Sequence, residues 1–312
     1  MKKLFLLPLL FISVVLDAQT TDDLLKEGEK KGEDKTPVAI FNHMKVINAN
    51  TTELIGKGKM DFNVTHNFGD LAGSLGGLKN FFGLDNTTDV RIGFEIGLGK
   101  NLDVIVSRAK AAGNISRIFE TGFKYRFLQQ TTDNSTPLSL ALFVNNCIST
   151  MDESDFPTDE NYFQDFSDRT SQVFQLILAK KIGKVSIQLN PTFLTQGYVV
   201  PNDDKSMFAI GGAIRVPVSK SVNIIADYFH AFRSETSEAF FALPPQGGIK
   251  FYDPLSVGFE ILTGGHVFHL NFTNAREILE NRFLPKTTSS WGKGQFRWAF
   301  NISRTFSLWK AK

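Results

Sequence analysis

The stretch Asp89–Arg108, DVRIGFEIGLGKNLDVIVSR, decides the fold. From Val90 to Leu98 apolar residues alternate with polar residues or glycine, and the alternation resumes at Leu102 after a Gly-Lys-Asn turn. A period of two places successive side chains on opposite faces of a β-strand. The stretch therefore predicts a β-hairpin with one apolar and one polar face.

Similar segments continue to the C-terminus, and long and short connections alternate between them. We expect strands at 57–68, 89–98, 102–108, 117–128, 138–146, 171–181, 185–194, 207–216, 222–232, 252–262, 266–273 and 295–304. A Greek-key sandwich mixes connection lengths, whereas a transmembrane barrel has short periplasmic turns, long outside loops and an even strand count. The predicted fold class is all-β, an antiparallel transmembrane β-barrel of about twelve strands.

The two faces of the predicted strands differ sharply in chemistry. In the strand at 117–128, Phe119 and Phe123 share one face, while Glu120 and Lys124 share the other. About eight strands already enclose as much space as side chains fill, so a larger barrel has an interior to line. We expect apolar residues toward lipid, which suits the 30 Phe residues of the 312-residue chain, and polar residues toward the lumen. Closure of the barrel lets every backbone N–H and C=O group of the strands form a hydrogen bond, which lipid could not supply.

The chain divides into three parts. Residues 1–18 combine two lysines, an apolar run and Ala18, the pattern of a secretory signal peptide. Residues 19–56 form a charged N-terminal lead-in, either periplasmic or a partial plug, within which 38–47 forms a short strand or enters the barrel mouth. Residues 57–312 form the barrel. No later stretch reaches the roughly 18 apolar residues of a spanning helix. The signal-peptide pattern and the transmembrane barrel together predict a location in a bacterial outer membrane.

Charged and polar residues on the inward face are the candidate site. The lumen-lining candidates are Arg91, Glu95, Glu120, Lys124, Arg126, Asp227, His269, Asn271 and Arg297. Ionisable groups at membrane depth are costly unless they line water or pair with one another. Two interpretations stay open: a paired network that fills and stiffens the barrel, or an aqueous or gated pathway whose charges set selectivity.

Signals for catalysis, metals and cofactors are weak, and we predict none of the three. His266 and His269 are three residues apart on a strand and so point to opposite faces. The acidic segment 152–168 lacks the spacing of a calcium loop. We keep the hypothesis that divalent cations bridge this segment to outer-leaflet lipid.

Residues 274–282 could make one short helical turn in the last outside loop. The net charge of +2 and the lack of a basic helix predict no nucleic-acid partner.

Three stretches resemble an uncharacterised β-barrel family of Bacteroidota that is known only as a domain of unknown function. They are FNHMKVINANTTELIGKGKMDFNVTHNFG (41–69), the hairpin at 89–108 and GGHVFHLNFTNAREILENRF (264–283). The resemblance spans roughly Phe41 to the C-terminus. It implies an outer-membrane barrel and no established activity. The end of the chain, with Phe306 and Trp309, is similar to the aromatic terminal strands that serve outer-membrane barrels as an assembly signal, which implies the barrel-assembly machinery as a partner.

Three functions remain after these observations. We expect first a passive pore or binding channel for a small solute, with outer-membrane lipid around it. The alternative is a closed structural or scaffold barrel that docks a periplasmic or surface partner. A lipid-modifying outer-membrane enzyme is the third.

Overall fold

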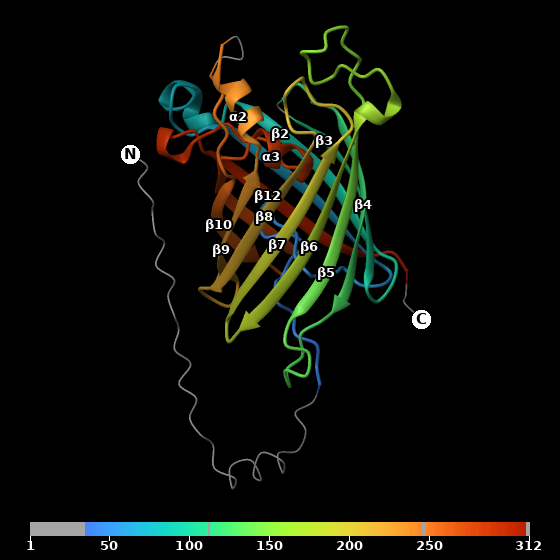
Figure 1. Cartoon of the computed structure of the whole chain (residues 1–312). Helices are drawn as coiled ribbons and strands as arrows, with labels where there is room; N and C mark the ends of the chain where they lie inside the picture. Colours follow the sequence, from blue (N-terminus) through green and yellow to red (C-terminus); the bar gives the residue numbers. More distant parts are fainter. Residues whose placement is uncertain (1–34, 112, 245–247, 310–312) are drawn as a thin grey trace, which may run out of the picture.

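The computed structural model describes residues 35–111, 113–244 and 248–309. These residues form one closed antiparallel barrel, shown in Figure 1. Its strands are β1 (Lys59–Asp70), β2 (Thr87–Gly97), β3 (Leu102–Lys110), β4 (Ile118–Leu128), β5 (Ser139–Ser149), β6 (Thr170–Ile182), β7 (Val185–Gln196), β8 (Ser206–Pro217), β9 (Val222–Phe232), β10 (Leu255–Leu262), β11 (His266–Thr273) and β12 (Arg297–Ser307). Neighbours in sequence are neighbours in the sheet, and β12 closes the ring against β1 with Phe306 opposite Met60.

The predicted fold class is confirmed, and each predicted strand overlaps an observed one. The bounds of β9 and β11 agree with the prediction, and the largest shifts are three residues. Strand β10 begins at Leu255 rather than 252, because the amide of Tyr252 donates to the carbonyl of Thr287 in a loop instead of joining the sheet. The proline at position 254 has no N–H to donate to a neighbouring strand.

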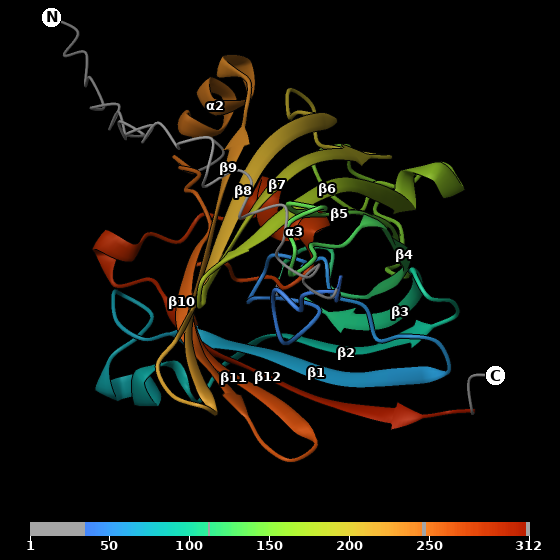
Figure 2. The same cartoon turned by 90° about the horizontal axis from the view of Figure 1, so that it is seen from below.

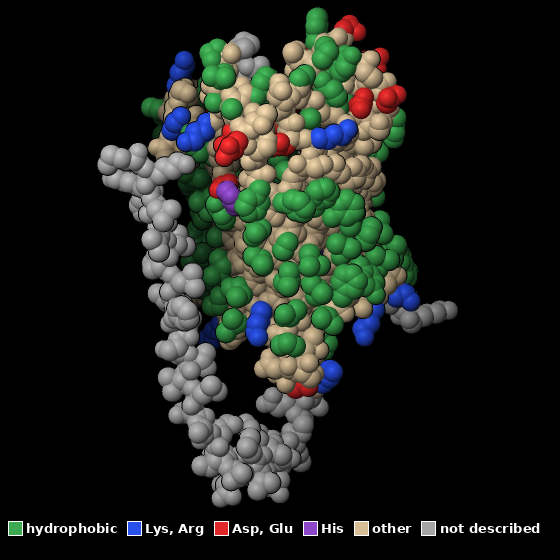
Figure 3. All heavy atoms as spheres, in the orientation of Figure 1, with side chains coloured by type: hydrophobic (Ala, Val, Ile, Leu, Met, Phe, Trp, Pro, Cys, Tyr) green, Lys and Arg blue, Asp and Glu red, His purple; other side chains and the backbone are tan. Residues whose placement is uncertain are grey.

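The barrel wall presents its apolar face outward. Figure 3 shows many hydrophobic side chains across the face of the wall that is in view. Phe123, Phe174 and Phe259 are exposed, whereas Lys124 and Gln175, each next to one of them in sequence, are fully buried. Soluble monomers rarely expose so large an apolar surface. No helix among the described residues is long and apolar enough to cross a membrane.

The long connections gather at one end of the barrel. They carry α2 (Glu235–Ala242), α3 (Glu280–Lys286) and 3-10 turns at Leu78–Gly83, Phe166–Arg169 and Trp291–Lys293. The opposite end, which we call the short-turn end, carries the connections β2–β3, β4–β5, β6–β7, β8–β9 and β10–β11.

One expectation for the long-loop end was partly wrong. The helix in the last long connection begins at Glu280, inside the predicted range 274–282, but it runs to Lys286 and lies inside the barrel rather than in an outside loop. Phe283 and Leu284 explain the inward position, because both are buried in the apolar cluster and the Phe283 ring lies 5.3 Å from that of Phe229 on β9. Removing such an apolar side chain from water contributes about 1.5–3 kcal/mol.

The N-terminal part of the described chain fills the barrel from the short-turn end. Residues 37–56, which we call the plug segment, run inside the ring in the view from below (Figure 2). Ile40, Phe41 and Val46 of this segment belong to one buried cluster with wall residues such as Phe143 and Ile177. The plug segment from one end and α3 from the other therefore occupy the space that the wall side chains leave.

Candidate functional site: the filled interior of the barrel

The tip of the plug segment is held by one wall carboxylate. Lys45 and Asn50 form an isolated antiparallel bridge, so the residues between them make a tight loop. The amides of Ile47, Asn48 and Ala49 all donate to Asp227 Oδ2 on β9, at 3.0, 2.6 and 2.9 Å. Successive backbone N–H groups in a turn form a concave site for an anion. Asp227 is therefore the receptor for the plug tip.

The other side of the plug segment is held by β3 and β4. Asp103 Oδ2 accepts from the amide of Ile55 at 2.7 Å, and Lys124 Nζ donates to the carbonyl of Glu53 at 2.9 Å. Lys124 also pairs with Glu95 at 2.9 Å. Because Asp103 and Lys124 are fully buried, these charges are satisfied by the plug and by one another rather than by bulk water.

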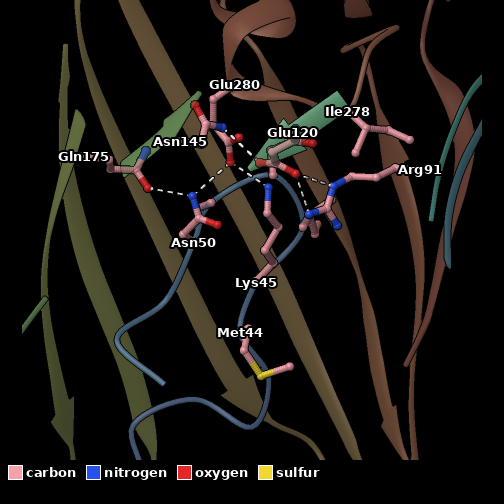
Figure 4. Close-up of polar contacts among 12 residues, drawn as sticks. Met44, Lys45, Asn50, Arg91, Glu120, Asn145, Gln175, Ile278 and Glu280 are labelled. Atoms are coloured by element: carbon pink, nitrogen blue, oxygen red, sulfur yellow. Dashed lines mark hydrogen bonds and ion pairs between the residues drawn. The ribbon is translucent and has the colours of Figure 1, made fainter. Parts of the chain in front are cut away.

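The plug segment and α3 meet at an ion pair in the middle of the barrel. Lys45 Nζ lies 2.6 Å from Glu280 Oε1, and Figure 4 shows the two side chains pointing toward each other. Asn50 donates to the same carboxylate oxygen at 2.9 Å and to Gln175 Oε1 on β6 at 3.1 Å. This group of residues connects both the plug segment and α3, the two pieces of chain that close the barrel, to the wall.

A second cluster links neighbouring strands rather than the plug. Arg91 donates to Glu120 Oε2 from Nε at 3.0 Å and from Nη2 at 2.7 Å. Ser107 donates to the same oxygen at 2.6 Å, and Asn145 donates to Glu120 Oε1 at 3.0 Å. Two guanidinium N–H groups thus donate to one carboxylate oxygen, and both are charge-assisted hydrogen bonds. The cluster stiffens the wall across β2 to β5.

The remaining predicted residues also face the interior. His269 is buried with its Nε2 atom 3.5 Å from Glu260 Oε2, and Asn271 is buried beside it on β11. Arg297 pairs with Asp70 at 2.8 Å, and Arg126 Nη1 reaches the carbonyl of Thr52 in the plug segment at 3.5 Å. The structure therefore divides eight of the nine predicted residues between plug contacts and wall contacts, with Asn271 buried on β11, rather than gathering them into one pocket.

The long-loop end has its own ionic cluster, which ties the acidic loop to α3. Arg282 of α3 pairs with Glu160 at 2.8 Å and with Glu277 at 2.6 Å, and Lys286 pairs with Glu160 at 3.2 Å and Asp203 at 2.8 Å. Burial alone would raise the pKa of Glu160, but Arg282 and Lys286 together hold it at about 2. These ion pairs hold α3 in place from the acidic loop at the long-loop end.

Two small cavities lie within the described interior. One of about 40 Å³ lies under the acidic loop, beside Cys147 and Arg282, and another of about 20 Å³ lies beside Lys45 and Glu120. A cavity needs about 10–15 Å³ to hold one water molecule, so each has room for a few waters. Among the described residues, Asp227 Oδ1 and Glu280 Oε2 are buried without a hydrogen-bond partner; such atoms are normally satisfied by water.

Sequence reasoning missed the residues that complete this site. Glu260 accepts from Asn42 of the plug segment at 2.7 Å, and it could have been found because it lies on the polar face of β10 with Ser256. Lys45, Asn50 and Glu280 could not, because they lie outside the twelve predicted barrel strands, where no alternation shows which side chains face the lumen.

A closed barrel with an apolar outer face and a charged, chain-filled interior defines a class: a plugged transmembrane β-barrel. Barrels of this kind belong to outer membranes. The chain belongs to the family described as the membrane-bound β-barrel domain DUF5777, whose model matches residues 41–306. The resemblance to a barrel family of unknown function is thus confirmed, and so is the predicted outer-membrane location.

Several solved barrels are similar in structure. They include the NanC porin (6% identity, TM-score 0.46, covering 80% of this chain and 100% of that one) and the KdgM porin (8%, 0.47, 80% and 99%). An outer-membrane channel from Pseudomonas putida F1 is 12% identical with a TM-score of 0.43, covering 82% and 98%. These likenesses concern the barrel fold alone. No curated protein matches the chain.

Proposed function

We propose that the protein is a gated channel for a small polar solute, in which the plug segment 37–56 is the gate. The observation that carries the proposal is the polar character of the wall residues that hold the plug segment. The plug touches β3, β4, β9 and β10 through hydrogen bonds to Asp103, Lys124, Asp227 and Glu260. A wall of this composition is what an aqueous pathway requires once the plug moves.

The energetics of these contacts support a movable plug. A hydrogen bond to a charged group contributes about 1.5–3 kcal/mol net, because water replaces the partner when the bond opens. The charged wall residues would be solvated by the entering water, so displacement would not strand them in lipid. Selectivity would then follow from the exposed charges, among them Lys124 and Asp227.

A closed scaffold barrel is the second candidate, and one observation favours it. Ile40, Phe41 and Val46 of the plug pack into an apolar cluster on the β5–β9 side of the wall. Fully burying such a side chain contributes about 1.5–3 kcal/mol, which argues for a permanently seated segment. In that case the loops or the chain before the plug would dock a partner.

Solute flux separates the two candidates. The mature chain and its Asp227→Ala/Lys45→Gln variant are reconstituted into liposomes, and swelling is followed in an isotonic solution of a small neutral sugar. We expect the variant to swell at least about tenfold faster, because it loses charge-assisted bonds of about 1.5–3 kcal/mol at the plug tip. Ser303→Ala is the control, since Ser303 faces the interior and makes none of the plug hydrogen bonds described above. Equal, background swelling of all three folded proteins would favour the scaffold.

A further inference from the structure

The short-turn end carries an open cavity that the plugged interior does not use. It has a volume of about 470 Å³ and lies between the β6–β7 and β8–β9 turns. Its polar lining comes from Lys181, Lys184, Arg215, Ser219 and Lys220, together with Asn42 of the plug segment. Pockets for small ligands have volumes of about 300–1,000 Å³, so the cavity has the size of a solute site.

The charge of this cavity is positive and uncompensated. Four of its lining residues are Lys or Arg, and none of those the structure describes there is Asp or Glu. No ion pair found in the described part of the chain includes any of these four cations. Elsewhere in this protein several buried cations have carboxylate partners, as Lys124 and Arg282 do. Figure 3 shows further Lys and Arg side chains along the same rim.

One of the cations is fixed in position at the floor of the cavity. Arg215 is only 6% exposed, and its guanidinium donates to Asn223 Oδ1 at 3.2 Å, to Ser186 Oγ at 3.2 Å and to the carbonyl of Ile40 at 3.1 Å. Its Nε–H has no partner among the described residues. A buried donor without a partner is costly, and the Arg215 side chain lines the cavity.

We propose that this cavity is a binding site for a phosphate group. Lys184 and Lys220 lie on the two turns and are exposed, so their flexible ammonium groups can close on a ligand from both sides, while Arg215 supplies a preset planar donor. Three mobile charges and one fixed charge favour a multiply charged anion over a single carboxylate. The group can belong to a soluble phosphate monoester or to the headgroup of a phospholipid in the adjoining leaflet.

Binding here has a consequence for the plug segment. Lys181 Nζ reaches the carbonyl of Ala39 at 3.4 Å, and Arg215 holds the next carbonyl along the chain. A phosphate that engages Lys181 and Arg215 competes with these contacts. The site stands without the gated channel, because it is defined by the wall and its turns, and its test below needs no flux.

The test titrates the mature protein in detergent with inorganic phosphate and glucose 6-phosphate by calorimetry, with glucose as the neutral match. The variant Lys181→Gln/Lys184→Gln/Lys220→Gln removes the cavity charges. The control Lys57→Gln/Lys59→Gln/Lys100→Gln removes three exposed charges from the opposite part of the same rim. A second arm compares retention of phosphatidylglycerol and phosphatidylcholine by native mass spectrometry in the same three proteins.

We expect glucose 6-phosphate to bind the native and control proteins, and to bind the cavity variant at least about tenfold more weakly, with an affinity that falls as salt is raised. If only phosphatidylglycerol is retained, and its retention is lost in the cavity variant alone, the phosphate is a lipid headgroup. Absence of binding in both arms, or an equal loss in the cavity and control variants, would overturn the proposal.

Discussion

Asp227 concentrates the attachment of the plug tip in one carboxylate oxygen. Three consecutive amides donate to it, and its other oxygen has no hydrogen-bond partner in the part of the chain that the structure describes. Hydrogen bonds to a charged acceptor contribute about 1.5–3 kcal/mol, roughly twice a neutral bond. A single side chain on β9 therefore controls the conformation of residues far away in sequence.

Replacing this carboxylate gives a prediction at a single residue. In Asp227→Ala, amide hydrogen exchange at Ile47, Asn48 and Ala49 should become about tenfold to a hundredfold faster, the factor that corresponds to about 1.5–3 kcal/mol. Asp227→Asn keeps one acceptor oxygen and should lie between the two. Exchange in β9 itself should not change. Native protection of the three amides in Asp227→Ala would show that the plug tip is held by other contacts.

Gly97 gives a second prediction at this scale, because the end of the plug segment crosses it closely. A Cβ atom on Gly97 would lie 2.0 Å from the carbonyl oxygen of Gly56, which no real contact allows. Gly97→Ala should therefore displace residues 53–56 and expose them to proteinase K. Gly99→Ala is the matched control, since a Cβ there would approach only Leu102, at 3.9 Å. Identical digestion of both variants would refute the tight crossing.

At the scale of elements, α3 is a second closure that depends on the acidic loop. The helix has only seven residues, too few to be stable alone in water. It is held by Phe283 in the apolar cluster and by the pairing of Arg282 and Lys286 with Glu160. The loop between β5 and β6 thus stabilises the position of α3 inside the barrel through the charge of Glu160.

This pairing predicts how acid affects the loop. The pKa of Glu160 is lowered from 4.5 to about 2 by Arg282 and Lys286, which outweigh the effect of burial. A lowered pKa in the folded state adds stability that is complete above about pH 4.5 and is lost as the pH falls toward 2. We expect pepsin to cleave residues 152–168 increasingly over that range.

The neutral variant provides the control for the acid experiment. Glu160→Gln should make the loop equally sensitive at pH 7 to proteinase K, whereas Glu153→Gln, which removes a largely exposed partner of Arg169, should not. A loop in the native protein that is digested equally at pH 5 and pH 2.5 would contradict the assigned role of Glu160.

At the scale of the whole molecule, the strands of the wall could be predicted from the sequence, whereas the plug segment and α3 inside the barrel could not. Period-two alternation, as in Phe123 beside Lys124, records which face of each strand meets lipid, and that pattern places all the strands within a few residues. The plug segment and α3 carry no such period, because each is shaped by the interior that it fills. Lys45 and Glu280 are 235 residues apart, so no local pattern could pair them.

The interior charges show the same limit. Alternation indicated that Glu120 and Asp227 point inward, but it could not say that Glu120 pairs with Arg91 on the wall while Asp227 receives the plug. Partner choice depends on the register between strands and on the path of the plug, and both are set by the closed barrel as a whole.

Single-channel conductance in a planar bilayer tests the gated-channel account most directly. The mature protein is compared with Asp227→Ala/Lys45→Gln, after heat-modified gel mobility shows that both are folded and proteolysis within residues 37–56 shows that the plug is released in the variant. The account predicts a native barrel that is almost always closed and a variant that is open at least about ten times as often. A folded variant with a released plug and no conductance would contradict it and leave a closed scaffold barrel.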